Sequence, residues 1–189
     1  MRYIVLGALA FLLVHLIDVV SLFFKRASRL KLYVWVLASG LLIYAVTGTS
    51  LHPGKFSLPA WTSWLGWALF LPALLLFLYS LFVNLPFRKT YLDTKSEQLI
   101  KVSLYALVRH PGVYFSFLTL ISLILVSHSR LLLTATLLWE GLDLLLIFVD
   151  DYYTFSRMFP GYDDYRRETP LLIPSRKSLR SFLDSTGKR

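Results

Sequence analysis

The sequence predicts an all-α integral membrane protein of about five transmembrane helices. Hydrophobic residues make up 56% of its 189 residues and charged residues only 16%, whereas a soluble domain has roughly 25% charged residues. The apolar residues come in blocks about as long as a bilayer is thick, near 20 residues each. The cations gather in the short connections between these blocks, as expected for loops that set membrane topology.

Five apolar segments account for most of the chain, at residues 3–24, 32–46, 60–85, 113–126 and 131–149. Only Arg2 precedes the first segment, four cations follow it, and it has no small-residue cleavage site, so we expect a membrane anchor rather than a signal peptide. His15 and Asp18 lie one turn apart inside it. They could form interhelical hydrogen bonds or serve a proton or ligand site, because ionisable groups are costly in a membrane.

The remaining segments differ in how they are delimited. Pro59 suits the start of the third segment, and Pro72 predicts a kink within it. A polar connector follows, with a short interfacial helix expected at 99–108. The last two segments are joined by only four residues and should pack as an antiparallel hairpin. The fourth segment is short for a full crossing, which a tilt can accommodate.

These elements predict one membrane domain at 1–174. Within it, 1–106 supplies scaffold spans and 107–174 forms the hairpin and a C-terminal lid, followed by a basic tail at 175–189 that lies on the membrane or is mobile. Lys and Arg number four after the first span, one after the second, five after the third and one in the hairpin turn. The alternation predicts an N-terminus outside and a cytosolic C-terminus and site. The net charge of +9 is therefore assigned to topology and membrane lipids, not to nucleic acid.

An acidic stripe marks the last span. Its members fall within an arc of about 100° on a helix: Glu140, Asp143, Asp150 and Asp151. Arg157 follows at the same spacing. Carboxylates on a membrane helix require a polar cavity or partners on other helices, and the spacing allows both.

The other polar cluster begins with Arg109-His110-Pro111, at the cytosolic entrance of the fourth span. A helix N-terminus and an arginine favour an anionic ligand group, although the same residues are common at membrane boundaries. Tyr162 and Tyr165 precede an extended segment at 169–174, where they could form a lid or anchor to headgroups. The chain has no cysteine, which excludes thiolate chemistry, and we expect no metal site.

These elements, in this order, resemble the C-terminal half of the isoprenylcysteine carboxyl methyltransferase family, which is similar to the membrane phospholipid N-methyltransferases. The resemblance covers about 105–174. It includes Arg109-His110-Pro111, Tyr162-x-x-Tyr165 and the Thr-Pro-x-x-x-Pro ending at 169–174. Asp150-Asp151 stands where the family has Glu-Glu, and Tyr114 comes one position later than the family tyrosine. One residue is missing or shifted between Phe159 and Tyr162.

The resemblance implies a methyltransferase with a cytosolic S-adenosylmethionine pocket and a lipophilic acceptor, such as an isoprenylcysteine carboxylate or related lipid, entering from the bilayer. It implies cofactor contacts from Arg109, His110, Pro111, Tyr114, Asp150, Asp151, Tyr162 and Tyr165. It implies catalytic roles for Asp151 and for Arg157, which would orient an anionic acceptor. Two alternatives stay open: an NADPH-dependent membrane reductase of the sterol-reductase type, and a non-catalytic membrane partner that retains the fold.

Overall fold

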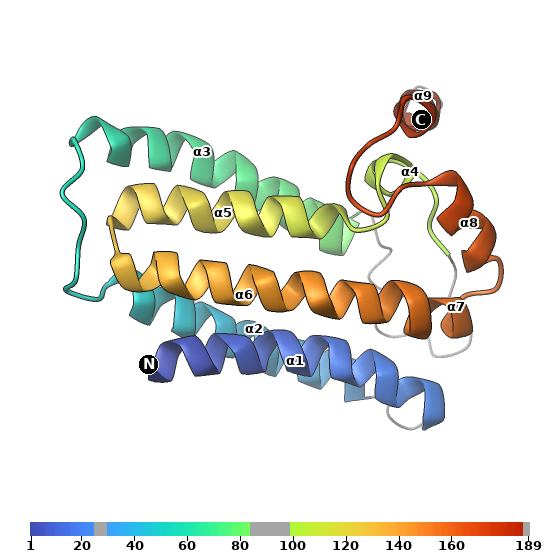
Figure 1. The fold of residues 1–189 in the computed structure, drawn as a ribbon, viewed down its shortest axis with the longest axis horizontal. Coiled ribbons are helices and arrows are strands. Elements are labelled where there is room, and N and C mark those ends of the chain that lie inside the picture. Colours follow the sequence, from blue (N-terminus) through green and yellow to red (C-terminus); the bar gives the residue numbers. More distant parts are fainter. Residues whose placement is uncertain (25–29, 84–98, 187–189) are drawn as a thin grey trace.

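Five long helices lie side by side in the computed structural model, which describes residues 1–24, 30–83 and 99–186 (Figure 1). They are α1 (Arg2–Phe23), α2 (Lys31–Ser50), α3 (Trp61–Leu78), α5 (Pro111–Ser127) and α6 (Arg130–Val149). No β-strand occurs within these ranges, apart from one isolated bridge. Four helices are long and apolar enough to cross a membrane, and α5, with 17 residues, is shorter. The predicted all-α membrane architecture is confirmed.

Several helices run further than their apolar patterns predict. Helix α2 reaches Ser50, and α3 continues through the π-helix η2 (Tyr79–Val83). The end of the third predicted segment lies outside the described residues. Helix α6 continues through the π-helix η4 (Asp150–Thr154) into α7 (Phe155–Met158). A helix extends past its apolar stretch when polar side chains in its last turns find partners, and η4 is such a case.

The polar connector is less helical than expected. Only α4 (Leu104–Leu107) forms within the predicted helix at 99–108, because Ser103 directly before it has a positive φ of 56°. A left-handed residue cannot continue a right-handed helix. After the hairpin come α8 (Tyr162–Glu168) and α9 (Arg176–Thr186).

Close helix contacts depend on glycine. A Cβ on Gly7 of α1 would lie 2.2 Å from the Trp139 ring of α6, and the Trp139 indole N–H donates to the Ile4 carbonyl at 2.8 Å. A Cβ on Gly66 of α3 would lie 2.8 Å from the Ser122 carbonyl oxygen of α5. Small residues at such crossings let membrane helices approach closely, so α1–α6 and α3–α5 are tightly packed pairs.

The hairpin turn is fastened to the loop before α3. His128 ends α5 with a φ of 52°, and the Ser129 hydroxyl oxygen accepts from the Leu132 N–H at the start of α6. The Phe56 N–H donates to the His128 carbonyl at 2.7 Å, which joins the loop to the turn.

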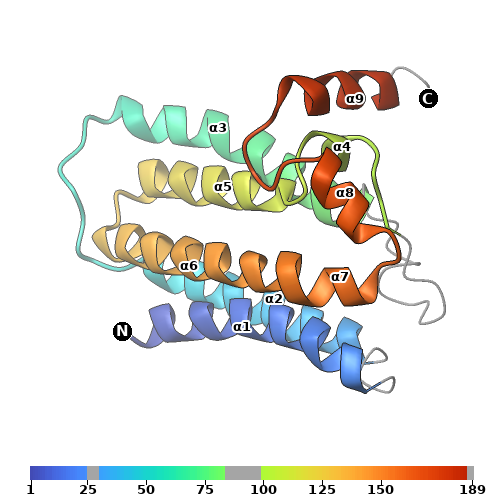
Figure 2. The same cartoon turned by 45° about the vertical axis from the view of Figure 1, so that its right-hand side comes forward.

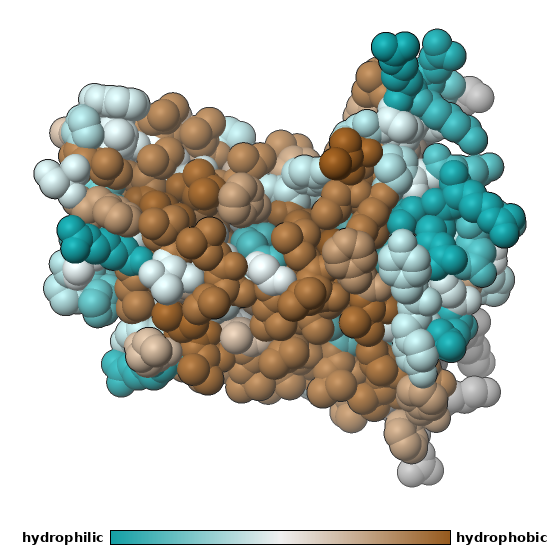
Figure 3. Space-filling view, viewed as in Figure 1, coloured by the Kyte–Doolittle hydropathy of each residue, from teal (hydrophilic) through white to brown (hydrophobic). Residues whose placement is uncertain are grey.

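The opposite end of the bundle carries α4, α7, α8 and α9 (Figures 1 and 2). The chain termini also lie at opposite ends (Figure 1). In Figure 3, hydrophobic side chains cover most of the visible face of the bundle, and hydrophilic ones gather over α8 and α9. This polar end contains the residues that the sequence singled out.

Candidate functional site

Asp151 is the centre of a buried polar cluster at this end. It lies in η4, and its side chain is 0% exposed. Its carboxylate accepts hydrogen bonds from Arg109 Nε at 2.7 Å and Nη2 at 2.8 Å, a bidentate pair. The Tyr162 hydroxyl donates to the same carboxylate at 2.6 Å. Three charge-assisted hydrogen bonds from two elements therefore hold one carboxylate, which is a strong arrangement in a buried setting.

Arg109 also binds the segment that ends α8. Its Nη1 donates to the carbonyls of Arg166 at 2.8 Å and Thr169 at 2.5 Å. Its backbone N–H donates to the Pro170 carbonyl at 3.0 Å, and the His110 N–H donates to the Leu171 carbonyl at 3.3 Å. The C-terminal segment is thus hydrogen-bonded across the start of α5 by side chain and backbone together. Arg109 therefore has a structural role here, because its guanidinium binds the Asp151 carboxylate and two backbone carbonyls.

His110 has a buried ring nitrogen with no hydrogen-bond partner among the described residues. It occupies the N-cap of α5, directly before Pro111 in the first helical turn. Its ring stacks on Phe155 with centroids 5.9 Å apart, and its Nε2 lies 3.7 Å from Asp151 Oδ1, beyond hydrogen-bond distance. A buried polar atom without a partner costs free energy, so this nitrogen is suited to receive a polar group of a ligand.

The tyrosines tie the cluster to α4 and to the C-terminal segment. Burial, and the neighbouring Asp151 carboxylate, raise the pKa of Tyr162 well above its usual range. Burial, and to a smaller extent the electrostatic effect of the neighbouring Tyr105, raise the pKa of Tyr165. The Tyr165 hydroxyl donates to the Tyr105 carbonyl at 2.6 Å. The Tyr114 hydroxyl donates to the Leu172 carbonyl. Tyr162 and Tyr165 therefore stay protonated at neutral pH, and both act as hydrogen-bond donors.

The Asp150-Asp151 pair is split between two networks. Asp150 Oδ2 contacts His15 Nδ1 of α1, and Asp143 Oδ1 lies 3.1 Å from His15 Nε2. Successive residues of a helix point about 100° apart, so neighbouring carboxylates serve different partners. Here Asp150 faces the bundle interior and Asp151 faces α4 and α8. The expected cofactor contact from Asp150 is replaced by a helix-to-helix contact in this structure.

The polar groups of the first span therefore follow the interhelical interpretation. His15 bridges two α6 carboxylates, and Asp18 pairs with Lys31 of α2 at 3.1 Å. The same outcome holds for two members of the acidic stripe, Asp143 and Asp150, which have a partner on α1. Glu140 is 6% exposed, and its Oε1 has no hydrogen-bond partner among the described residues.

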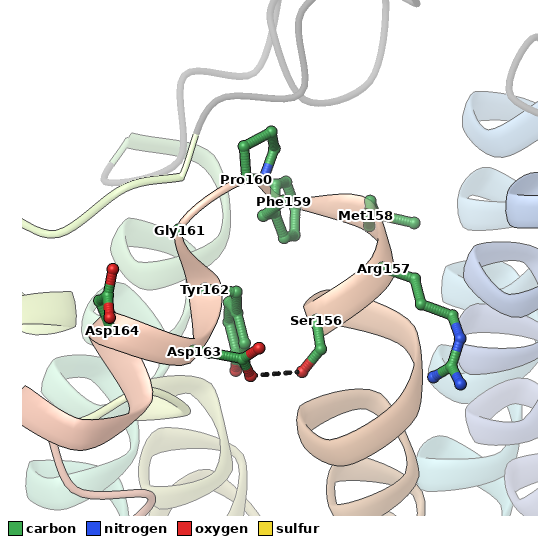
Figure 4. Close-up of a pocket in the computed structure, with 9 residues that line it drawn as sticks. All are labelled: Ser156, Arg157, Met158, Phe159, Pro160, Gly161, Tyr162, Asp163 and Asp164. Carbon is green, nitrogen blue, oxygen red and sulfur yellow. Dashed lines mark hydrogen bonds between the residues drawn. The ribbon is translucent and has the colours of Figure 1, made fainter.

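A shallow hollow of about 380 Å³ lies beside the cluster, lined by residues 156–164 (Figure 4). The Ser156 hydroxyl donates across it to Asp163 Oδ1 at 3.2 Å. Arg157 is directed away from Tyr162 in this view, and its guanidinium lies over the Tyr153 ring, 3.9 Å from the centroid. The sequence placed Arg157 beside the acidic stripe on the helical wheel; in the structure its Nη1 donates to the Tyr153 carbonyl at 2.8 Å.

The structure thus joins Arg109, His110, Asp151 and Tyr162 in one cluster. Pro111, Tyr114 and Tyr165 lie around it, while Asp150 and Arg157 turn elsewhere. Sequence reasoning missed Phe155, which stacks on His110. It also left the partner of His15 unassigned, although an ionisable residue in an apolar span had indicated that one exists.

Fold and cluster together define a helical membrane protein with a buried Arg–Asp–Tyr network at its polar end. No protein-family model matches the chain, and no solved structure matches it. The chain is similar to the nickel-cobalt-cadmium resistance protein NccN of Alcaligenes xylosoxydans xylosoxydans, with 30% identity over 87 residues. The match covers 46% of this chain and 41% of that protein, so the chain spans less than half the length of this relative.

Proposed function

We propose that the protein is a membrane-embedded S-adenosylmethionine-dependent methyltransferase that acts on a lipophilic acceptor. The observation that carries the proposal is the convergence of the motif residues. Arg109, His110, Asp151 and Tyr162 are separated by up to 53 positions in the chain, yet they meet in one buried cluster. Arg109, His110 and Tyr162 are also residues through which the sequence resembles the isoprenylcysteine carboxyl methyltransferase family, and Asp151 stands where that family has a glutamate.

The cluster contains groups that fit the cofactor. His110 Nε2, which makes no hydrogen bond to the described residues and lies 3.7 Å from Asp151 Oδ1, offers a contact to a polar group of the ligand, and Phe155 beside it offers stacking. The Asp151 carboxylate is already bound by Arg109 and Tyr162, so on this proposal it would hold these residues in place around the cofactor. When bound, S-adenosylmethionine supplies an already electrophilic methyl group, so the protein needs mainly to align the acceptor. Arg109 holds Asp151 in place, Tyr114 holds the C-terminal segment, and Tyr165 holds α8 against α4.

The acceptor would approach from the bilayer. The apolar surface of the bundle meets the hydrophilic surface over α8 (Figure 3), and a lipid-anchored carboxylate or amine would approach α8 from this side. An isoprenylcysteine carboxylate or related lipid suits this position. Arg157, stacked on the partly exposed Tyr153, is available at the surface to orient an anionic acceptor before transfer.

We also propose five membrane crossings, with the N-terminus outside and the site in the cytosol. The alternation of cations between loops supports this orientation. The positions of the termini at opposite ends of the bundle are compatible with an odd number of crossings (Figure 1). Helix α5 packs beside α3 and α6 despite its shorter length.

Metal resistance is a second candidate, favoured by the name of the matched relative. The described part of the chain contains no group of three or more His, Asp or Glu side chains arranged to hold a metal ion.

One titration series separates these functions. The purified protein in nanodiscs is titrated calorimetrically with S-adenosylhomocysteine, with NADPH, and with Ni²⁺, Co²⁺ and Cd²⁺. We expect S-adenosylhomocysteine to bind and His110→Ala to weaken it about 5- to 100-fold, the loss of one or two buried hydrogen bonds. His52→Ala, in the loop at the opposite end, is the matched control and should not change binding.

The other outcomes overturn the proposal in distinguishable ways. Binding of NADPH alone would indicate the reductase alternative. Binding of the metal ions alone would indicate a metal-handling protein. If none of these ligands binds to protein that is folded, the chain is a non-catalytic membrane partner. Equal effects of the His110 and His52 substitutions would place the ligand elsewhere.

A further inference from the structure

Helix α9 (Arg176–Thr186) runs across the bundle rather than along it. Figure 1 views α9 nearly end-on, while the long helices lie across the picture, and Figure 2 shows α9 from the side. If the bundle axis follows the membrane normal, α9 lies parallel to the membrane plane. It is placed at the polar end, where the membrane surface would be.

The serine side of α9 packs on the protein. Ser178 is 1% exposed, and the Ser185 hydroxyl oxygen accepts from the Ser103 N–H at 3.0 Å. Ser175 and Ser178 cap the helix start reciprocally, since each backbone N–H donates to the other's hydroxyl, at 2.9 and 3.1 Å. The helix is therefore ordered and fixed in rotation, and its other faces have definite directions.

Those other faces are amphipathic. Leu179 is 49% exposed and Leu183 58% exposed, one turn apart. Three cations flank them, Arg176, Lys177 and Arg180, against a single acid, Asp184. In Figure 3 the projection at the position of α9 is hydrophobic on the side that overhangs the apolar flank of the bundle and hydrophilic on the far side.

We propose that α9 is a membrane-surface helix that binds anionic lipid headgroups. Leu179 and Leu183 enter the boundary between headgroups and acyl chains, and Arg176, Lys177 and Arg180 contact the phosphates. A basic polar face beside an apolar face is the pattern of helices that lie in a membrane interface. The position, direction and charge of α9 all fit this partner, independently of any methyl transfer.

The consequence concerns the site. α9 directly follows the segment at 169–174, whose Pro170 and Leu171 carbonyls accept from the backbone N–H groups of Arg109 and His110. Lipid bound at α9 therefore holds this segment at the membrane surface. The local membrane composition then influences how firmly the C-terminal segment covers the buried cluster.

The absence of cysteine allows a direct test. Single variants Leu179→Cys and Ser181→Cys, on opposite faces of α9, are labelled with a nitroxide in full-length protein in vesicles with and without phosphatidylglycerol. We expect the Leu179 label to be more accessible to oxygen than to a water-soluble nickel chelate in anionic vesicles, and the Ser181 label to show the reverse. Equal water access of both labels would overturn the proposal.

The charge requirement is tested by Arg176→Gln, Lys177→Gln and Arg180→Gln together in the Leu179→Cys protein. We expect the label to move outward in anionic vesicles, and the same label at Ser181 reports whether α9 is still folded. If burial of the Leu179 label depends neither on lipid charge nor on these cations, anionic headgroups are not the partner. Efficient cross-linking between Leu179→Cys chains at high dilution in lipid would assign the face to a second copy instead.

Discussion

Neutralising Asp151 should release the C-terminal segment without unfolding the bundle. Asp151→Asn replaces one carboxylate oxygen by an amide donor that faces the donors of Arg109 and Tyr162. It also leaves the Arg109 guanidinium, which is 7% exposed, without its counter-ion. Breaking a buried ion pair from one side costs about 3–5 kcal/mol. Because the hydrogen bonds from Arg109 hold the segment, most of this cost falls on its opening equilibrium.

Hydrogen exchange measures that equilibrium. If the free energy of opening the C-terminal segment falls by 3–5 kcal/mol, its amide hydrogens exchange about 100 to 10,000 times faster. The upper limit is the exchange rate of the fully open segment. The reporters are the N–H groups of Arg109, His110 and Thr169, which donate to carbonyls of the segment or of α8. Amides in the middle of α6 should change little.

Asp163→Asn is the matched control. It removes the same charge from an Asp whose side chain is 59% exposed and which pairs with Arg166 at 3.3 Å. An exposed pair contributes about 0–1 kcal/mol, so exchange should rise less than about tenfold. If Asp151→Asn speeds exchange no more than Asp163→Asn does, the buried network does not hold the segment and the reasoning is refuted.

Three further predictions concern the bundle and the tyrosines. Gly7→Ala should destabilise the protein by about 1–3 kcal/mol through collision with the α6 indole, whereas Gly40→Ala, with no atom within 4 Å of the new Cβ, should be neutral or stabilising in SDS unfolding titrations. His15→Ala should cost about 3 kcal/mol because two buried carboxylates, Asp143 of α6 and Asp150 of η4, lose their partner, while His52→Ala should stay within about 0.5 kcal/mol in the same titration. Because the pKa of Tyr162 is higher in the folded than in the unfolded protein, Tyr162 contributes its full stabilisation below pH about 10. This stabilisation is lost as the pH rises through the raised pKa of the folded protein. Phenolate absorbance should therefore show the buried tyrosines, Tyr162 and Tyr165 among them, ionising only with unfolding, and Tyr162→Phe should reduce the number of such groups by one. An unchanged titration of the variant would contradict this assignment.

The helices and their approximate ends were predictable from local pattern. Apolar length predicted the long helices, and the proline after His110 correctly placed the start of α5. The four-residue connection predicted the hairpin, and Ser129 supplies the cap that starts α6. Only the helix expected at 99–108 was largely wrong, because the positive φ of Ser103 has no strong signal in a serine.

The candidate site was predictable as a list but not as an arrangement. Arg109, His110 and Tyr162 were expected near Asp151, and the structure joins them. A helical wheel places Asp150 and Asp151 about 100° apart but does not show which helix lies opposite each side chain, so their separate pairing with His15 and Arg109 could not be predicted.

The sequence by itself determined the class of protein: apolar length requires helices, and the position of the cations predicts which loops share a side of the membrane. Both depend on neighbours in the chain, so they can be read locally. The tertiary structure alone decided which charged groups are paired. His15 reaches Asp143 and Asp150 across separations of 128 and 135 residues, and Arg109 reaches Asp151 across 42. Such pairings depend on which helices pack together and how each is rotated, and the local pattern determines neither.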